Sequence, residues 1–309
     1  MIDNRVVIVK RTTRLDELIG RFNTIGQARF YVEHLGASFE DYEQEHKTYY
    51  KSLKEVEASV GTFARIYVLD RSFLPSYIFS TTDIVVVVGQ DGLVANTLKY
   101  LDGQATLGVN PDPKRWDGVL LPFAAPEVGD IVKQVVSDKR TTKTVNMGQV
   151  KLQDGQQLLA VNDFFIGQKG HASARYEILF GNEREAQSSS GVIVSTGLGS
   201  SGWLKSVLAG ASGIVNSITG TNQKIKQETS TPWDANYLTF SVREPFQSKT
   251  TGSGIVFGKV QSGTALKIVS LMGENGVIFS DGIEKDYLEF NSGMEATISL
   301  AAKKGNLVV

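Results

Sequence analysis

The sequence predicts an α/β domain with a parallel sheet, followed by a β-rich domain made of stacked antiparallel sheets. In the first part of the chain, strand-like runs that are apolar at every position alternate with helical patterns, as in a parallel sheet covered on both faces. In the second part, short β-rich runs are separated mostly by turn residues, which favours antiparallel pairing. The expected domains are residues 1–138 and 139–309.

The first domain is expected to contain four strands and four helices. The strands are apolar, β-branched runs at residues 6–9, 64–69, 84–88 and 106–109. The helices, at residues 15–22, 38–61 and 92–101 and from Pro126 onward, show apolar residues spaced along one face. Ser38 precedes an acidic first turn, and Pro126 suits the first position of a helix. The charged stretch 137–144 is the expected boundary.

The second domain is expected to be mostly strands. They are expected at residues 158–166, 176–180, 192–194, 237–242, 255–260, 266–271 and 277–280. The main helical exception is residues 200–218. The polar stretches 217–236 and 247–253 are expected to form loops.

Composition excludes several classes of function. The 309 residues carry 32 basic and 33 acidic side chains, so no global field favours nucleic acid or an anionic membrane. No cysteine is present, which excludes disulfides, thiolate metal sites and cysteine nucleophiles. The three scattered histidines, His34, His46 and His171, argue against a zinc site or a Ser-His-Asp triad.

The N-terminus, MIDNRVVIVK, has the character of neither a secretory signal nor a transit peptide. No apolar run approaches the roughly 20 residues that span a bilayer. A soluble, cytoplasmic protein is expected.

The first candidate site is the turn Gly89-Gln90-Asp91-Gly92, which follows the apolar strand IVVVV and opens a helix. Glycines in such a turn expose N–H groups beside a helix N-terminus, where phosphate binds. A carboxylate there repels anions, but it can accept a proton from an attacking hydroxyl or help to position Mg²⁺. The motif therefore indicates phosphoryl transfer, with an N-capping aspartate in a tight turn as an equally good alternative.

Two common nucleotide-binding classes are excluded. The chain has no Walker A motif, and no GxGxxG follows its first strand.

Asn162 and Asp163 form the second candidate site. They lie inside the apolar run LLAVNDFFIG, where adjacent polar residues need partners. An amide and a carboxylate together suit a vicinal diol such as ribose. A β-bulge or a turn at the end of a strand, with local backbone bonds, is equally consistent with the pattern.

The third candidate site is the stretch 188–206, which again runs from strand to glycine-rich turn to helix. Its backbone and hydroxyl donors suit a second phosphate. The candidate residues are Thr196, Gly199, Ser200, Ser201, Gly202, Trp203 and Ser206. Trp203 either stacks on a base or packs in the protein, and packing is the commoner fate.

These motifs occur in an order that resembles the NAD kinase family, and most closely its mitochondrial-type branch. They are GQDG at 89–92, GVNPDPKRWDGVLLP at 108–122, AVNDFFIG at 160–167, SSGVIVSTGLGSSGW at 189–203, LTFSVREPF at 238–246 and FSDG at 279–282. The match spans roughly residues 84 to 290, and several motifs in register are far more specific than any one of them.

The resemblance implies ATP-dependent phosphorylation of the 2'-hydroxyl of the adenosine ribose of NAD, in a homodimer or larger assembly. The first domain would bind nucleotide, and the second would bind the dinucleotide and form the oligomer. Asp91 would activate the hydroxyl, and ATP would act with Mg²⁺. Asn162 and Asp163 would hold NAD together with the residues of the 196–206 turn and helix, and Asn110 matches the motif after the next strand.

The sequence departs from the family pattern at three places. Gln90 replaces a glycine, which would cost on the order of 1 kcal/mol if that position needs a positive φ. Its side chain would either crowd a phosphate or donate a hydrogen bond to it. Leu93 stands where threonine is common, and Gly197-Leu198 replaces a Pro-Thr pair of other branches. Two alternatives therefore stay open: a related kinase acting on a lipid or sugar hydroxyl, and a catalytically impaired nucleotide sensor.

Overall fold

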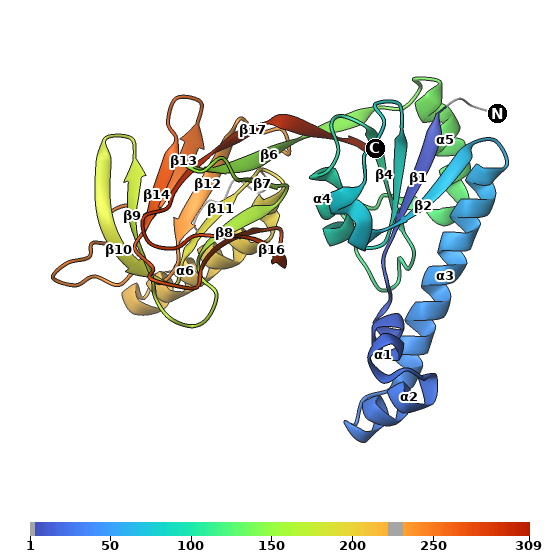
Figure 1. Ribbon diagram of the computed structural model, residues 1–309, viewed down its shortest axis with the longest axis horizontal. Helices are drawn as coiled ribbons and strands as arrows, with labels where there is room; N and C mark the ends of the chain where they lie inside the picture. The colour runs from blue at the N-terminus through green and yellow to red at the C-terminus, as the bar shows by residue number, and fades with distance from the viewer. Residues whose placement is uncertain (1–3, 222–230) are drawn as a thin grey trace. The chain divides into compact units, whose positions relative to one another are not determined.

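The computed structural model describes residues 4–221 and 231–309, which divide into two compact units (Figure 1). The first unit runs to Lys143 and takes in Gly305–Val309, and the second is Thr144–Lys304. The chain thus changes unit five residues after the expected boundary at 138, and it returns to the first unit at its end. Residues 222–230 of the expected loop 217–236 lie outside the described residues.

A parallel sheet forms the centre of the first unit. Its strands, β1 (Arg5–Lys10), β2 (Arg65–Asp70), β3 (Ile84–Val88) and β4 (Ala105–Asn110), follow the order β2-β1-β3-β4. Each pairs in parallel with its neighbour, so that Val86 lies between Ile8 and Leu107. The short β5 (Phe123–Ala124) and the end of β17 (Glu295–Val308) also pair with β4 in parallel. The predicted parallel sheet is confirmed.

Two helices cover one face of this sheet. The helices α3 (Phe39–Gly61) and α5 (Val128–Val136) bury their apolar stripes against the alternate residues of β1, β3 and β4 that face them. The helix α4 (Asp91–Leu98) packs on β3 and β4. The central strands β1, β3 and β4 are therefore apolar on both faces, because helices pack on each face.

The helices α1 (Arg14–Phe22) and α2 (Ile25–His34) form a hairpin beside the N-terminal end of α3 (Figure 1). Their small core contains Leu15, Ala28, Val32 and Phe39, separate from the core of the sheet. Thr13 caps α1 in a capping box with Asp16, which fixes the point where the chain leaves β1 and turns into the helix.

The second unit stacks two sheets face to face around a core of alternating apolar side chains. One sheet is antiparallel throughout, in the order β13 (Phe257–Gln261), β12 (Tyr237–Val242), β11 (Val192–Ser195), β8 (Asp163–Gln168), β15 (Gly276–Ser280) and β16 (Ile283–Glu289). The other contains β10 (Glu183–Ser189), β9 (Ala174–Phe180), β14 (Leu266–Ser270), β17, β6 (Thr142–Leu152) and β7 (Gln157–Ala160). The predicted stack of antiparallel sheets is confirmed.

Several elements differ from the sequence prediction. The expected strand 158–166 is two strands, β7 and β8, because the chain bends at Val161 and Asn162. The expected helix 200–218 is a short 3-10 turn, Gly199–Ser201, followed by α6 (Trp203–Thr219). The helix expected at 92–101 begins at Asp91 and ends at Leu98. Among the described helices, none is both long and apolar enough to cross a membrane.

The sterically most demanding glycine near the sheet is Gly108, in the middle of β4. A Cβ built there would lie 1.8 Å from the carbonyl oxygen of Leu120, so the loop after β4 crosses the strand at backbone contact. We expect Gly108→Ala to lower the free energy of unfolding by about 2 kcal/mol or more, since backbone must move.

Gly92→Ala is the matched control, because a Cβ at Gly92 meets nothing within 4 Å. It should change the free energy of unfolding by less than about 1 kcal/mol. Both are measured by chemical denaturation. Equal losses of stability for the two variants would contradict the close contact between Gly108 and the backbone of Leu120.

Candidate nucleotide site

Asp91 lies where β3 ends and α4 begins, and its carboxylate is held by the loop that follows β4. The N–H of Leu120 donates to Oδ1 at 2.7 Å, and the N–H of Val119 donates to Oδ2 at 3.3 Å. The side chain is half-buried. Each oxygen thus receives one backbone donor, which fixes the direction of the carboxylate and leaves it further acceptor capacity.

Asp91 is not the N-cap of its helix, so the N-capping interpretation is wrong. The capping position is Gln90, whose side chain makes no capping hydrogen bond. Gln90 has φ of -114° and ψ of 163°, an extended conformation that any residue adopts. The substitution of glycine by Gln90 therefore carries no backbone strain.

Asn110, at the end of β4, organises the same loop. It is buried, its amide donates to the carbonyl of Trp116 at 2.9 Å, and its Oδ1 accepts from the N–H of Asp112 at 3.0 Å. Asp91 and Asn110 together hold residues 111–120 at the carboxyl edge of the sheet, where ligands bind in open α/β folds.

Tyr49 also stabilises the carboxyl edge of the sheet. The hydroxyl of Tyr49, on α3, accepts from the N–H of Arg11 at 2.8 Å and donates to the carbonyl of Val88 at 3.1 Å. It therefore ties the ends of β1 and β3 together, directly before the turn that contains Asp91. Burial raises the pKa of this hydroxyl, so it stays protonated as the donor.

In the second unit, Asn162 and Asp163 lie at a turn that a single carboxylate holds. Oδ1 of Asp281 accepts from the N–H groups of Val161 at 3.1 Å, Asn162 at 2.6 Å and Asp163 at 3.2 Å. The N–H of Asp281 donates in return to the carbonyl of Asp163 at 2.9 Å. Asp281 belongs to the FSDG motif and is not among the predicted site residues. The signal was an Asp-Gly pair directly after a strand.

The side chain of Asp163 has unusual electrostatics. It is 9% exposed, and among the described residues no hydrogen bond reaches its carboxylate. Burial, reinforced by the negative charge of Asp281, raises the pKa of Asp163 to about 7. Near neutral pH this group therefore exchanges between a hydrogen-bond donor and an acceptor.

The glycine-rich turn after β11 packs directly on this turn. The N–H of Thr196 donates to the carbonyl of Asn162 at 2.9 Å, and its hydroxyl donates to that of Val161 at 2.5 Å. A Cβ on Gly199 would lie 2.0 Å from the carbonyl oxygen of Asn162, so only glycine fits there. The structure thus brings together Asn162, Asp163, Thr196, Gly199 and the Asp281 carboxylate.

The remaining predicted residues of this segment fall into two groups. Ser200 is buried, and its hydroxyl donates to the carbonyl of Gly197 at 2.7 Å. Ser201, Gly202 and Ser206 are exposed at the start of α6. Their exposure leaves them available to a ligand.

Trp203 packs against other side chains and remains partly exposed. Its ring stacks on Phe165 at 5.8 Å between centroids, and Phe165 stacks on Phe279 at 5.0 Å. The guanidinium of Arg243 lies 5.5 Å from the indole ring. Trp203 remains half-buried.

The described residues contain no group of three or more His, Asp or Glu side chains placed to hold a metal ion. Asp91, Gly89, Gln90, Gly92 and Asn110 belong to the first unit, and the other predicted site residues belong to the second.

Two solved structures are similar to the chain over nearly its whole length. An NAD kinase from Archaeoglobus fulgidus in complex with ATP has a TM-score of 0.59 and 14% sequence identity, over 99% of this chain and 93% of that one. Yeast NADH kinase complexed with NADH has a TM-score of 0.58 and 14% identity, over 99% of this chain and 83% of that one.

The chain has the fold of the NAD kinases. The predicted resemblance is confirmed at the level of the fold, including its two parts. No protein-family model matches the chain, and no curated protein matches its sequence.

Asp281 should be essential to the 161–163 turn. We expect Asp281→Ala to lower the free energy of unfolding by about 3 kcal/mol or more, because three backbone donors lose a charged acceptor. Asp281→Asn keeps the oxygen that accepts all three and should cost only about 1 kcal/mol. Denaturant titrations measure both, and a similar loss for the two variants would disprove this role.

Asp163 should make stability depend on pH. Its pKa is about 7 in the folded chain and about 3.9 in an unfolded one, so between these values the folded chain binds the proton more tightly. Its contribution is therefore lost as pH rises toward 8. Asp163→Asn should flatten the fall in melting temperature between pH 5 and 8, measured by calorimetry.

Asp117→Asn, at an exposed carboxylate, is the control and should leave the pH profile unchanged. A profile of Asp163→Asn that runs parallel to that of the unsubstituted chain would exclude the shifted titration.

Proposed function

We propose that this chain is a kinase that transfers the terminal phosphoryl group of ATP to the 2'-hydroxyl of the adenosine ribose of NAD, giving NADP. One observation carries the proposal. In a chain with the NAD kinase fold, a carboxylate stands between glycines at the carboxyl end of a buried parallel strand, with its orientation fixed by two backbone donors.

The proposed role of Asp91 is that of general base. As the ribose oxygen attacks phosphorus, its proton passes to the Asp91 carboxylate, the new O–P bond forms, and the bond to the leaving ADP oxygen breaks. The N–H groups of Val119 and Leu120 occupy one acceptor position on each carboxylate oxygen. Acceptor positions remain for the hydroxyl proton.

Phosphate binding is assigned to the backbone around Asp91. Gly92, in the first turn of α4, is exposed, and its N–H group is one of the donors that have no partner inside the helix. Gln90 is half-buried, and its side chain has an amide to offer to a phosphate. If Mg²⁺ is bound together with ATP, it would supply positive charge that offsets the negative charge developing during transfer.

The dinucleotide is assigned to the second unit. Asn162 and Asp163 face a ribose diol, because Asp163 is able both to accept and to donate a hydrogen bond near pH 7. Ser201, Gly202 and Ser206 supply exposed donors, and the half-buried ring of Trp203 supplies a surface for stacking. The hydroxyls of Thr196 and Ser200 serve the turn itself. A homodimer or larger assembly remains a prediction.

The two alternatives differ from the proposal in substrate or in activity. A related kinase would phosphorylate a lipid or sugar hydroxyl with the same base. An impaired sensor would bind NAD without turnover, and it was suggested chiefly by Gln90. Since Gln90 is unstrained, the structure offers no backbone reason for impairment.

The test is formation of NADP by the purified chain supplied with NAD, ATP and Mg²⁺, followed by a coupled dehydrogenase assay. Asp91→Asn should lower kcat by about a hundredfold or more, because the base is lost, while circular dichroism and melting stay close to those of the unsubstituted chain. Asparagine keeps an oxygen that is able to accept from Leu120. Asp117→Asn, at an exposed carboxylate of the same loop, should retain full activity.

Each outcome assigns a function. Turnover of NAD supports the proposal. Turnover only with a lipid or sugar acceptor supports the related kinase, and NAD binding by calorimetry without product supports the sensor. Equal activity of Asp91→Asn and the unsubstituted chain would remove Asp91 from the chemistry.

A further inference from the structure

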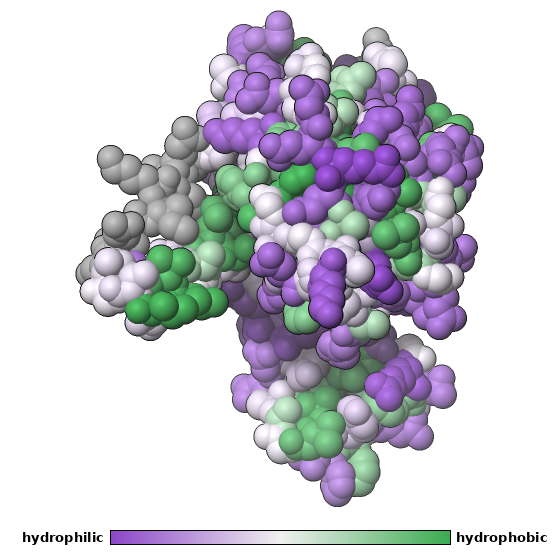
Figure 2. Space-filling model, turned by 90° about the vertical axis from the view of Figure 1, so that its left-hand side faces the viewer, coloured by the Kyte–Doolittle hydropathy of each residue, from purple (hydrophilic) through white to green (hydrophobic). Residues whose placement is uncertain are grey.

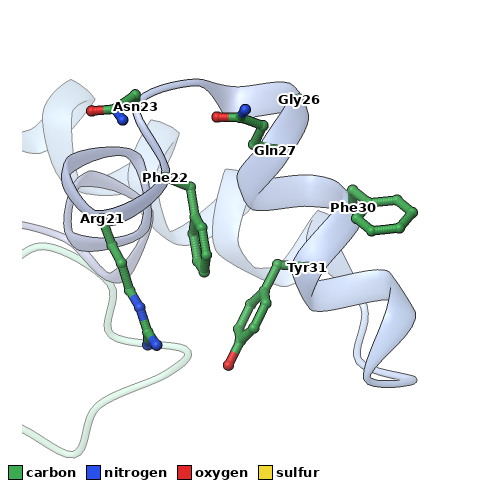
Figure 3. Close-up of a pocket in the computed structure, with 7 residues that line it drawn as sticks. All are labelled: Arg21, Phe22, Asn23, Gly26, Gln27, Phe30 and Tyr31. Carbon is green, nitrogen blue, oxygen red and sulfur yellow. The ribbon is translucent and has the colours of Figure 1, made fainter.

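The hairpin of α1 and α2 carries a hollow that plays no part in the proposed kinase reaction. Its volume is about 530 Å³, and it lies open between the end of α1 and the start of α2 (Figure 3). The lining includes Arg21, Phe22, Asn23, Gln27, Phe30 and Tyr31. Figure 3 shows the side chains of Arg21, Phe22 and Tyr31 extending from the two helices toward the same side.

Arg21 is stacked against aromatic rings at this hollow. Its guanidinium carbon lies 5.2 Å from the ring centroid of Phe22 and 5.6 Å from that of Tyr31. The two rings are themselves in contact, with centroids 4.5 Å apart. Contact through the guanidinium face leaves the N–H donors at its edge free, in the fork that matches a carboxylate.

The other two arginines of the α1–α2 hairpin that lie over aromatic rings are neutralised. Arg14 lies over Tyr42 and pairs with Asp41 and Glu45. Arg29 lies over Phe39 and pairs with Glu33 and Glu43. Within residues 4–221 and 231–309, Arg21 has no such carboxylate partner. Among the stacked arginines of this hairpin, the one without a carboxylate partner is therefore the one that lines the hollow.

The same hairpin exposes large apolar side chains. Ile25 is 51% exposed, Phe30 is 71% exposed and Leu35 is 66% exposed. The lower part of Figure 2, where Figure 1 places this hairpin, shows apolar residues gathered on the surface. These exposed side chains are not part of the small core of the hairpin, so packing within the hairpin does not account for them.

We propose that this hollow binds a small molecule in which a carboxylate is attached to a flat aromatic ring. The carboxylate accepts two parallel hydrogen bonds from the edge of the Arg21 guanidinium. Its negative charge neutralises the positive charge of Arg21. The ring packs against Phe22 and Tyr31, and the amides of Asn23 and Gln27 offer further polar contacts. The volume lies within the range usual for small-molecule sites.

The test uses 2-naphthoate as the probe and 2-naphthamide as its neutral counterpart. Amide chemical shifts of the full chain labelled with ¹⁵N are followed during titration. We expect 2-naphthoate to shift residues 21–31, and 2-naphthamide to bind about tenfold more weakly, because a charged hydrogen-bonded pair is lost. Arg21→Gln should weaken binding of 2-naphthoate by about tenfold or more.

Arg29→Gln is the matched control, since it removes a stacked guanidinium from the same hairpin that already has carboxylate partners. It should leave the affinity for 2-naphthoate unchanged. The proposal is overturned if 2-naphthoate causes no shifts in residues 21–31 up to its solubility limit, if the amide binds equally well, or if the two variants behave alike. These readouts do not depend on kinase activity.

Discussion

In each unit, one carboxylate accepts hydrogen bonds from several backbone N–H groups and so stabilises an irregular segment next to the end of a strand. Asp91 does this for Val119 and Leu120, and Asp281 does it for residues 161–163. Backbone donors without a partner are costly once water is removed, so these turns need an acceptor. The same carboxylates thereby set the positions of the groups assigned to nucleotide and ribose.

The arrangement around Asp281 has an electrostatic consequence. Three backbone donors stabilise its negative charge, but Asp163 lies beside it, is buried and receives no such donor among the described residues. The two carboxylates are therefore unequal, and the proton resides on Asp163. The diol proposed to bind here needs both donors and acceptors, and the unequal protonation of these two carboxylates would supply both.

Apolar periodicity was enough to predict the parallel sheet and α3, because their side chains are buried on regular faces. It missed β10, EREAQSS, and β16, IEKDYLE, since these outer strands of the sheets are largely polar. It also missed α2, whose apolar residues do not share one stripe. The pairing of Asp281 with residues 161–163 joins positions more than a hundred residues apart, and no local pattern indicates such a contact.

Gly92 differs from two glycines of the turn after β11, and the difference bears on the proposed ligand binding. At Gly197 and Gly199 a Cβ would lie within 2.0 Å of a backbone carbonyl oxygen, so the packing of the protein alone explains glycine there. At Gly92 a Cβ would meet nothing within 4 Å, although alanine would favour the helix. Packing does not explain Gly92. The phosphate contact proposed above would explain it, because a side chain would stand between the ligand and the N–H donors.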